Sequence, residues 1–234
     1  MIKAILFDLD GTLNLMDQDV FTPEYVKALV EYATPLGYEP EQFVNALFSG
    51  MEAMASNDGP RLNCDVFWEA MTKNLGERVL SDRKKLDAFY ETDFDSMHAF
   101  CPDSPRAPEL VKKLKDAGYL LAIASNPVFP ITAHNMRLGW TGLDPADFDH
   151  ISAYDNSHYC KPNPKYFLEV AEKLAVDPSE CIMVGNNAKE DMAASAVGMD
   201  TFLVTYEIIN YDNIDISHIK NGGYDALLDY LGVK

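Results

Sequence analysis

The sequence has few positive charges and no long apolar run. Lysine and arginine number 19 against 37 aspartate and glutamate residues, so the net charge is −18. A chain with this excess of negative charge repels nucleic acid and anionic lipid, and we expect neither as a partner. Its apolar runs stay well short of the ~18 residues that span a bilayer, which excludes a membrane-spanning class of protein.

Cysteine is scarce as well. The four cysteines (Cys64, Cys101, Cys160 and Cys181) form no CxxC pair and no spacing typical of metal ligands. We therefore expect reduced thiols. The N-terminus runs directly into a strand-like segment instead of a cationic and then apolar leader, so we expect a cytoplasmic protein. The sequence does not indicate an oligomeric state.

What the sequence does contain is a series of short apolar strands alternating with helical patterns. The strands are predicted at 3–8, 119–125, 150–154, 181–185 and 201–206. Segments 108–118, 164–176 and 189–198 have helical periodicity or helix-ending glycines. Strands that alternate with helices predict an α/β fold with a parallel sheet that is covered on both faces.

The stretch between the first and second predicted strands has a different pattern. It contains helical segments such as PEYVKALVEYA and DVFWEAMTKNL and no convincing strand. We therefore predict an all-helical cap domain over 16–100, inserted into a core domain made of 1–15 and 101–234. Met51, Met54, Phe67 and Trp68 are assigned to the apolar core of this insert rather than to a substrate pocket.

Polar residues follow four of the five predicted strands. The first strand runs into Asp8-Leu9-Asp10-Gly11-Thr12, and the second ends in Ser125-Asn126. Lys161-Pro162 follows the third strand, and Gly185-Asn186-Asn187, with Asp191 beyond, follows the fourth. Ligands bind outside the carboxyl ends of the strands in open α/β sheets, so these groups are expected to meet in one crevice.

This set of motifs resembles the haloacid dehalogenase (HAD) superfamily. The resemblance covers the whole core domain and implies a Rossmann-like parallel sheet with a helical cap inserted after the first motif. Members with both aspartates are mostly magnesium-dependent phosphatases that act through an aspartyl-phosphate. The resemblance implies Asp8 as the nucleophile and Asp10 as the general acid and base. Lys161 would supply positive charge, while Thr12, Ser125 and Asn126 would bind the substrate phosphate.

The resemblance also implies a Mg²⁺ site formed by Asp8, the Asp10 backbone carbonyl, residue 186 and Asp191. The fourth family motif usually begins Gly-Asp, whereas this chain has Asn186 at that position. An amide oxygen can still coordinate Mg²⁺, but one negative ligand is lost. We therefore expect weaker metal binding with intact chemistry. Glu190 and Asn187 are interpreted as polar residues at a helix start, and His134 as a core or surface residue.

Four functions are compatible with these residues. We favour a magnesium-dependent phosphomonoester hydrolase that acts on a small phosphorylated metabolite. A sugar phosphomutase would use the same residues and return the phosphoryl group to the sugar. A 2-haloacid dehalogenase would need neither the metal nor a second acid, so Asp10 weighs against it. A binding module with weakened catalysis is supported only by Asn186.

Overall fold

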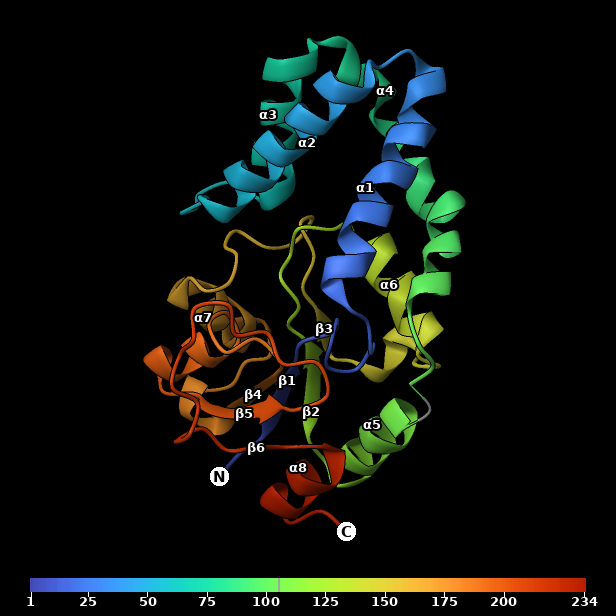
Figure 1. Ribbon diagram of the computed structural model, residues 1–234. Helices are drawn as coiled ribbons and strands as arrows, with labels where there is room; N and C mark the ends of the chain where they lie inside the picture. Colours follow the sequence, from blue (N-terminus) through green and yellow to red (C-terminus); the bar gives the residue numbers. More distant parts are fainter. Residues whose placement is uncertain (105) are drawn as a thin grey trace.

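The structure is a computed structural model that describes residues 1–104 and 106–234. Its centre is a parallel sheet in the order β3-β2-β1-β4-β5-β6 (Figure 1). The strands are β1 (Ala4–Phe7), β2 (Leu120–Ile123), β3 (His150–Ile151), β4 (Cys181–Gly185), β5 (Asp200–Val204) and β6 (Asn221–Gly222). Phe7 is in register with Ile123 on one side and Val184 on the other, so the three central strands end at the same level.

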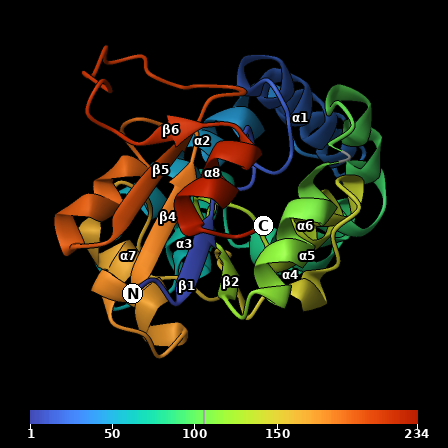
Figure 2. The ribbon, with the colours of Figure 1, turned by 90° about the horizontal axis from the view of Figure 1, so that it is seen from below.

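Helices cover both faces of the sheet because successive side chains of a strand point in opposite directions. Ile5 and Phe7 of β1 pack in one apolar cluster with α5 and α8, while Ala4 and Leu6 pack in another with α7 (Figure 2). The core helices are α5 (Arg106–Asp116), α6 (Ile131–Trp140), α7 (Pro164–Lys173) and α8 (Tyr224–Leu231). This arrangement confirms the predicted α/β class.

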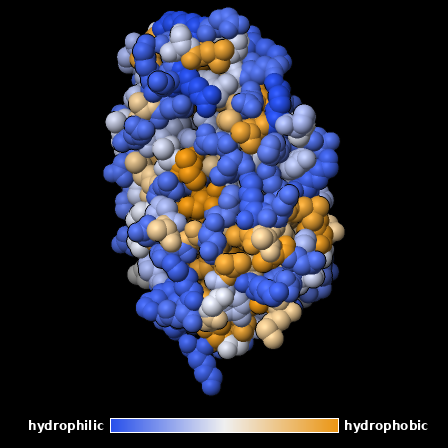
Figure 3. Space-filling view, turned by 180° about the vertical axis from the view of Figure 1, so that it is seen from behind, coloured by the Kyte–Doolittle hydropathy of each residue, from blue (hydrophilic) through white to orange (hydrophobic). Residues whose placement is uncertain are grey.

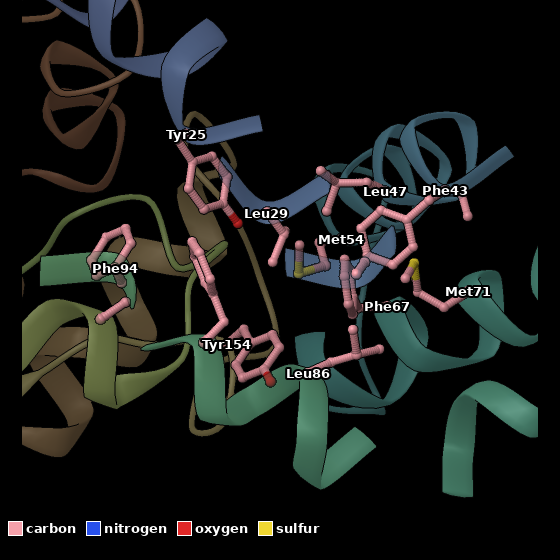
Figure 4. Packing of buried hydrophobic residues seen from close by; sticks show 14 of the residues in the cluster. Tyr25, Leu29, Phe43, Leu47, Met54, Phe67, Met71, Leu86, Phe94 and Tyr154 are labelled. Carbon is pink, nitrogen blue, oxygen red and sulfur yellow. The ribbon is translucent and has the colours of Figure 1, made fainter. Parts of the chain in front are cut away.

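The chain between β1 and α5 forms a helical layer beyond the carboxyl end of the sheet (Figure 1). It contains α1 (Gln18–Ala33), α2 (Pro40–Ala55), α3 (Asn63–Leu75), α4 (Arg78–Asp87) and the 3-10 helices η1 (Thr34–Leu36), η2 (Ala88–Glu91) and η3 (Asp93–Phe100). Its aromatic and aliphatic side chains form one buried cluster (Figure 4). Tyr154 and Ala133 of the core belong to the same cluster, so the division at 16–100 remains a proposal.

The structure differs from the sequence prediction mainly at element ends. The strand predicted at 150–154 spans only His150–Ile151. The helix predicted at 189–198 is a shorter 3-10 helix, η6 (Met192–Val197). Two further 3-10 helices, η4 (Pro145–Asp147) and η5 (Pro178–Glu180), lie in loops. The edge strand β6 was missed because its sequence, Asn-Gly, is typical of a turn and only backbone pairing with β5 makes it a strand.

Hydrophilic residues cover much of the surface, with hydrophobic residues interspersed among them on the face shown in Figure 3. None of the helices in the described residues has the length and apolar character needed to cross a membrane.

Candidate active site

The polar groups that follow the strands line one cavity of about 210 Å³ between the sheet and the helical layer. The predicted residues that line it are Asp8, Asp10, Ser125, Asn126, Lys161, Asn186 and Asp191. Thr12 is fully buried, and its hydroxyl lies 3.4 Å from both Asp8 Oδ2 and Asn186 Oδ1. The alignment of β1, β2 and β4 therefore brings together side chains that are up to 183 positions apart in the sequence.

Lys161 bridges two of the carboxylates. Its Nζ donates to Asp8 Oδ1 at 2.8 Å and to Asp191 Oδ1 at 2.6 Å, and its side chain is 1% exposed. Its backbone N–H donates to Asn126 Oδ1 at 3.2 Å, which fixes the loop after β3 to the end of β2. Burial alone would lower the pKa of Lys161, but the carboxylates of Asp191 and Asp8 outweigh burial and raise the pKa above its usual value. The lysine is therefore a fixed positive charge beside Asp8.

The surroundings of Asp8 change its acidity strongly. Burial, together with the nearby charge of Asp191, raises the pKa of Asp8 to about 7, against the lowering effect of Lys161. Its Oδ1 is held by Lys161, whereas its Oδ2 has, among the described residues, only the long contact with Thr12. One oxygen of Asp8 is thus anchored and the other is left for chemistry in the cavity.

Asp10 is held by a residue that the sequence analysis missed. Arg137 of α6 is fully buried and donates from Nη1 to Asp10 Oδ2, while Asn14 Nδ2 donates to Asp10 Oδ1 at 3.1 Å. The guanidinium carbon also lies 4.4 Å from the centroid of the Phe129 ring. The sequence contained a signal for this contact, namely an arginine within the apolar stretch around Leu138. A buried arginine requires a partner, so its position predicts an acidic residue nearby.

His134 completes the network around Arg137. Arg137 Nη2 lies 3.0 Å from His134 Nδ1, and because a guanidinium can only donate, Nδ1 must be the acceptor. The ring proton is therefore on Nε2, which has no partner among the described residues. Burial, followed by the charges of Arg137 and Lys161, lowers the pKa of His134 well below its usual value. His134 was predicted as a core or surface residue, and the structure places it in the core with a neutral ring.

The loop after β4 orients the residue that departs from the family motif. Asn186 Nδ2 donates to the Glu207 carbonyl at 2.5 Å, so its Oδ1 faces Thr12. The amide packs on Gly11, where an added Cβ would lie 2.1 Å from Nδ2 and where φ is +83°. Glycine at position 11 is therefore required both by the backbone conformation and by the close approach of Asn186.

Asp191 has both of its oxygens engaged. Oδ1 accepts from Lys161, and Oδ2 accepts from the Asn187 backbone N–H at 2.9 Å. A Cβ on residue 185 would lie 2.2 Å from Asp191 Oδ2, so Gly185 makes room for this carboxylate. Asp191 therefore positions Lys161 and the turn after β4.

Two further residues reach the cavity although other roles were predicted for them. Met51 of α2 lines the cavity, so its assignment to the core of the insert alone was wrong. Glu190 also lines it and accepts from Asn126 Nδ2 at 3.2 Å. Burial raises the pKa of Glu190, in spite of the nearby charge of Lys161. Asn187 accepts from the backbone N–H groups of Lys189 and Glu190. These bonds form a turn, and the following 3-10 helix begins only at Met192, so the predicted helix start at Asn187 and Glu190 was wrong.

Comparisons with known proteins agree with this geometry. The family model of haloacid dehalogenase-like hydrolases matches residues 2–198. A pyrophosphatase PpaX from Halalkalibacterium halodurans is 27% identical over 236 residues, covering 100% of this chain and 98% of the relative. A phosphoglycolate phosphatase from Psychrobacter arcticus is 30% identical over 239 residues, covering 98% of this chain and 95% of the relative.

Solved structures show the same fold. The crystal structure of a HAD phosphatase from Thermococcus onnurineus superposes with a TM-score of 0.63 at 24% identity, covering 100% of this chain and 99% of that one. The family model matches most of the chain. This match agrees with the sheet order, with the helical insertion after β1 and with the polar residues that follow the first four strands. The chain belongs to the haloacid dehalogenase-like hydrolase family.

Proposed function

We propose that this protein hydrolyses small phosphate monoesters through a phosphoryl group carried on Asp8. The observation that carries the proposal is the buried contact of Lys161 with both Asp8 and Asp191 at the carboxyl edge of the sheet. A carboxylate that attacks an anionic phosphate needs positive charge beside it, and Lys161 supplies that charge. The phosphatase and pyrophosphatase names of the relatives support the same reaction class.

The first half of the reaction transfers the phosphoryl group to the protein. One carboxylate oxygen of Asp8 forms a bond to phosphorus, and the other stays available to the metal proposed below, while the bond from phosphorus to the leaving oxygen breaks. Asp10, which is the ionised partner of Arg137 in the free protein, takes up a proton when the anionic substrate binds. It gives this proton to the leaving oxygen, so the product leaves as an alcohol. The Ser125 hydroxyl and the Asn126 backbone N–H are proposed to bind the phosphoryl oxygens, and the place of both residues on the cavity wall supports this role.

The second half returns the protein to its starting state. Asp10, now a carboxylate, takes a proton from water while the water oxygen bonds to phosphorus and the bond from Asp8 to phosphorus breaks. Arg137 and Asn14 hold the carboxylate of Asp10, which supports this base role. The burial of Thr12 between Asp8 and Asn186 supports a positioning role for its hydroxyl rather than direct contact with substrate.

The donor set fits Mg²⁺. Asp8 Oδ2 and Asn186 Oδ1 both lie 3.4 Å from the Thr12 hydroxyl, which has only one proton to share between them. Two converging oxygen acceptors with one donor are suited to a hard cation, and the Asp10 backbone carbonyl would be a third ligand. In residues 1–104 and 106–234, no group of three or more His, Cys, Asp or Glu side chains is arranged to hold a metal. When bound, Mg²⁺ would stabilise negative charge on the transferring phosphoryl group.

Asp191 was also predicted as a metal ligand. Because both of its oxygens already accept hydrogen bonds, we propose that it acts on the site through Lys161. The Mg²⁺ ligands would then be Asp8, the Asp10 carbonyl and Asn186, with the remaining positions taken by water and substrate oxygens, which is typical of Mg²⁺ sites in enzymes.

The experiment is release of phosphate from phenyl phosphate, measured with Mg²⁺ and with EDTA. We expect turnover that needs Mg²⁺ and that Asp8→Asn abolishes. The control is Asp116→Asn, since Asp116 is an exposed residue of α5 paired only with Lys112 among the described residues. Mass spectrometry of the quenched enzyme should show a phosphoryl adduct on Asp8. An Asp8→Asn enzyme that is folded and hydrolyses the ester at the parental rate would contradict the mechanism.

A further inference from the structure

The charges around the cavity are unbalanced. Among the described residues that line it, four carry carboxyl groups, namely Asp8, Asp10, Glu190 and Asp191, and Lys161 is the single cation. Lys161 is already shared between Asp8 and Asp191. Arg137 lies behind Asp10 and is fully buried, so it is not presented to a ligand. Lys161 and the Mg²⁺ proposed above both lie at the Asp8 end of the cavity, so the positive charge is placed for one phosphoryl group.

Another part of the cavity lining, called the apolar wall below, is apolar and aromatic. It is formed by Met16, Phe21, Tyr25, Val26, Met51, Val128 and Phe129. The rings of Tyr25 and Phe129 meet edge to face with centroids 5.1 Å apart, and Phe21 stacks on Tyr25 with centroids 6.4 Å apart. Figure 4 shows Tyr25 extending from α1 toward the buried cluster.

The polar groups on this wall are also uncharged. Burial raises the pKa of Tyr25 to about 12, and its hydroxyl is 2.7 Å from the Tyr90 hydroxyl. Gln18 and Thr22 of α1 are the neutral polar residues that line this side. Arg137 lies behind this wall, 4.4 Å from the Phe129 ring centroid, and is already paired with Asp10. A leaving group with a negative charge would therefore meet carboxyl groups and, among the described residues that line the wall, no cation, so its desolvation would be uncompensated.

We propose that the enzyme is selective for phosphate monoesters of small, uncharged and largely apolar alcohols or phenols, and that it discriminates against substrates with a second anionic group. This inference rests on the proposed function. The cavity of about 210 Å³ is below the roughly 300–1,000 Å³ of pockets for drug-sized ligands. The leaving group is accordingly small, and pyrophosphate and phosphoglycolate, the substrates in the names of two relatives, are poor substrates here.

The test compares phosphoglycolate with its carboxamide, which has nearly the same shape and an uncharged leaving group. With Mg²⁺ present, we expect kcat/KM to be at least about 100-fold higher for the carboxamide, near the upper range of pocket discrimination. Butyl phosphate, which is apolar, should be hydrolysed at least as well as the carboxamide. Equal or better hydrolysis of phosphoglycolate would overturn this inference and leave the proposed function intact. Release of phosphate from none of the esters, phenyl phosphate included, would refute the proposed function and this inference with it.

A second experiment changes the charge of the apolar wall of the cavity. Met51→Lys places a cation on the apolar wall, and Val26→Lys does so from α1 in case the first variant does not fold. We expect either variant to raise the phosphoglycolate to carboxamide ratio of kcat/KM by about tenfold. Leu80→Lys, at an exposed position of α4, is the matched control and should leave the ratio unchanged. A folded wall variant with the parental ratio would contradict the proposal.

Discussion

Replacing Arg137 by methionine removes the partner of Asp10 while keeping a long side chain with good helix propensity in α6. The parent pair is buried, since the side chains of Arg137 and Asp10 are 1% and 9% exposed. Removing one partner of a buried ion pair leaves an uncompensated charge and costs about 3–5 kcal/mol. Asp10 also borders the cavity, where water can reach it, so we expect the lower end, about 3 kcal/mol.

The assay is thermal unfolding, combined with a double-mutant cycle. A loss of about 3 kcal/mol corresponds to a decrease in Tm of roughly 6–12 °C for a chain of this length. Asp10→Asn in the Arg137→Met background removes the unpaired charge, and we expect it to recover about 2 kcal/mol of the loss. The matched control is Arg106→Met, because the Arg106–Asp225 pair is exposed and its loss should lower Tm much less than Arg137→Met does.

Two results would refute this reasoning. One is a decrease in Tm for Arg137→Met that is no larger than that of Arg106→Met, which would mean that the buried pair does not stabilise the fold. The other is an Arg137→Met, Asp10→Asn double variant that is no more stable than Arg137→Met alone, which would mean that the loss comes from packing against Phe129 rather than from the charge of Asp10.

Three further predictions follow from the site. Asp8→Asn should stabilise the metal-free protein at pH 7 by up to about 4 kcal/mol. The pKa of Asp8 is about 7 in the folded protein and 3.8 in the unfolded chain, so the parent protein loses stability as the pH rises from 3.8 to 7. The gain, measured as Tm in EDTA, should shrink toward pH 4, and a gain independent of pH would contradict the cause. Asn186→Asp should tighten Mg²⁺ binding but lower the Tm of the metal-free protein, since it replaces the donor to the Glu207 carbonyl by an acceptor; an unchanged Mg²⁺ titration would refute the ligand assignment. Gly11→Ala should lower both stability and activity, because its Cβ would lie 2.1 Å from Asn186 Nδ2; retention of parental activity would argue against the close packing of this loop.

The sequence alone determined the sheet class and seven of the residues that line the cavity. The alternation of apolar strands with helices required a parallel sheet, and the polar residues after the strands had to meet at its carboxyl edge. Asp8, Ser125, Lys161 and Asn186 were found in this way because each directly follows, or lies a short loop beyond, a strand whose position the apolar pattern reveals.

Only the tertiary structure decided which partners these side chains have. Arg137 reaches Asp10 across 127 positions of sequence, and Lys161 reaches Asp8 across 153, so local patterns carry no information about these contacts. Met51 was assigned to a core because helical periodicity specifies which residues are apolar but not whether another layer covers them. The packing of the helical insert over the sheet made that residue part of the cavity wall. The same packing placed other apolar residues of α1, among them Phe21 and Val26, in the lining.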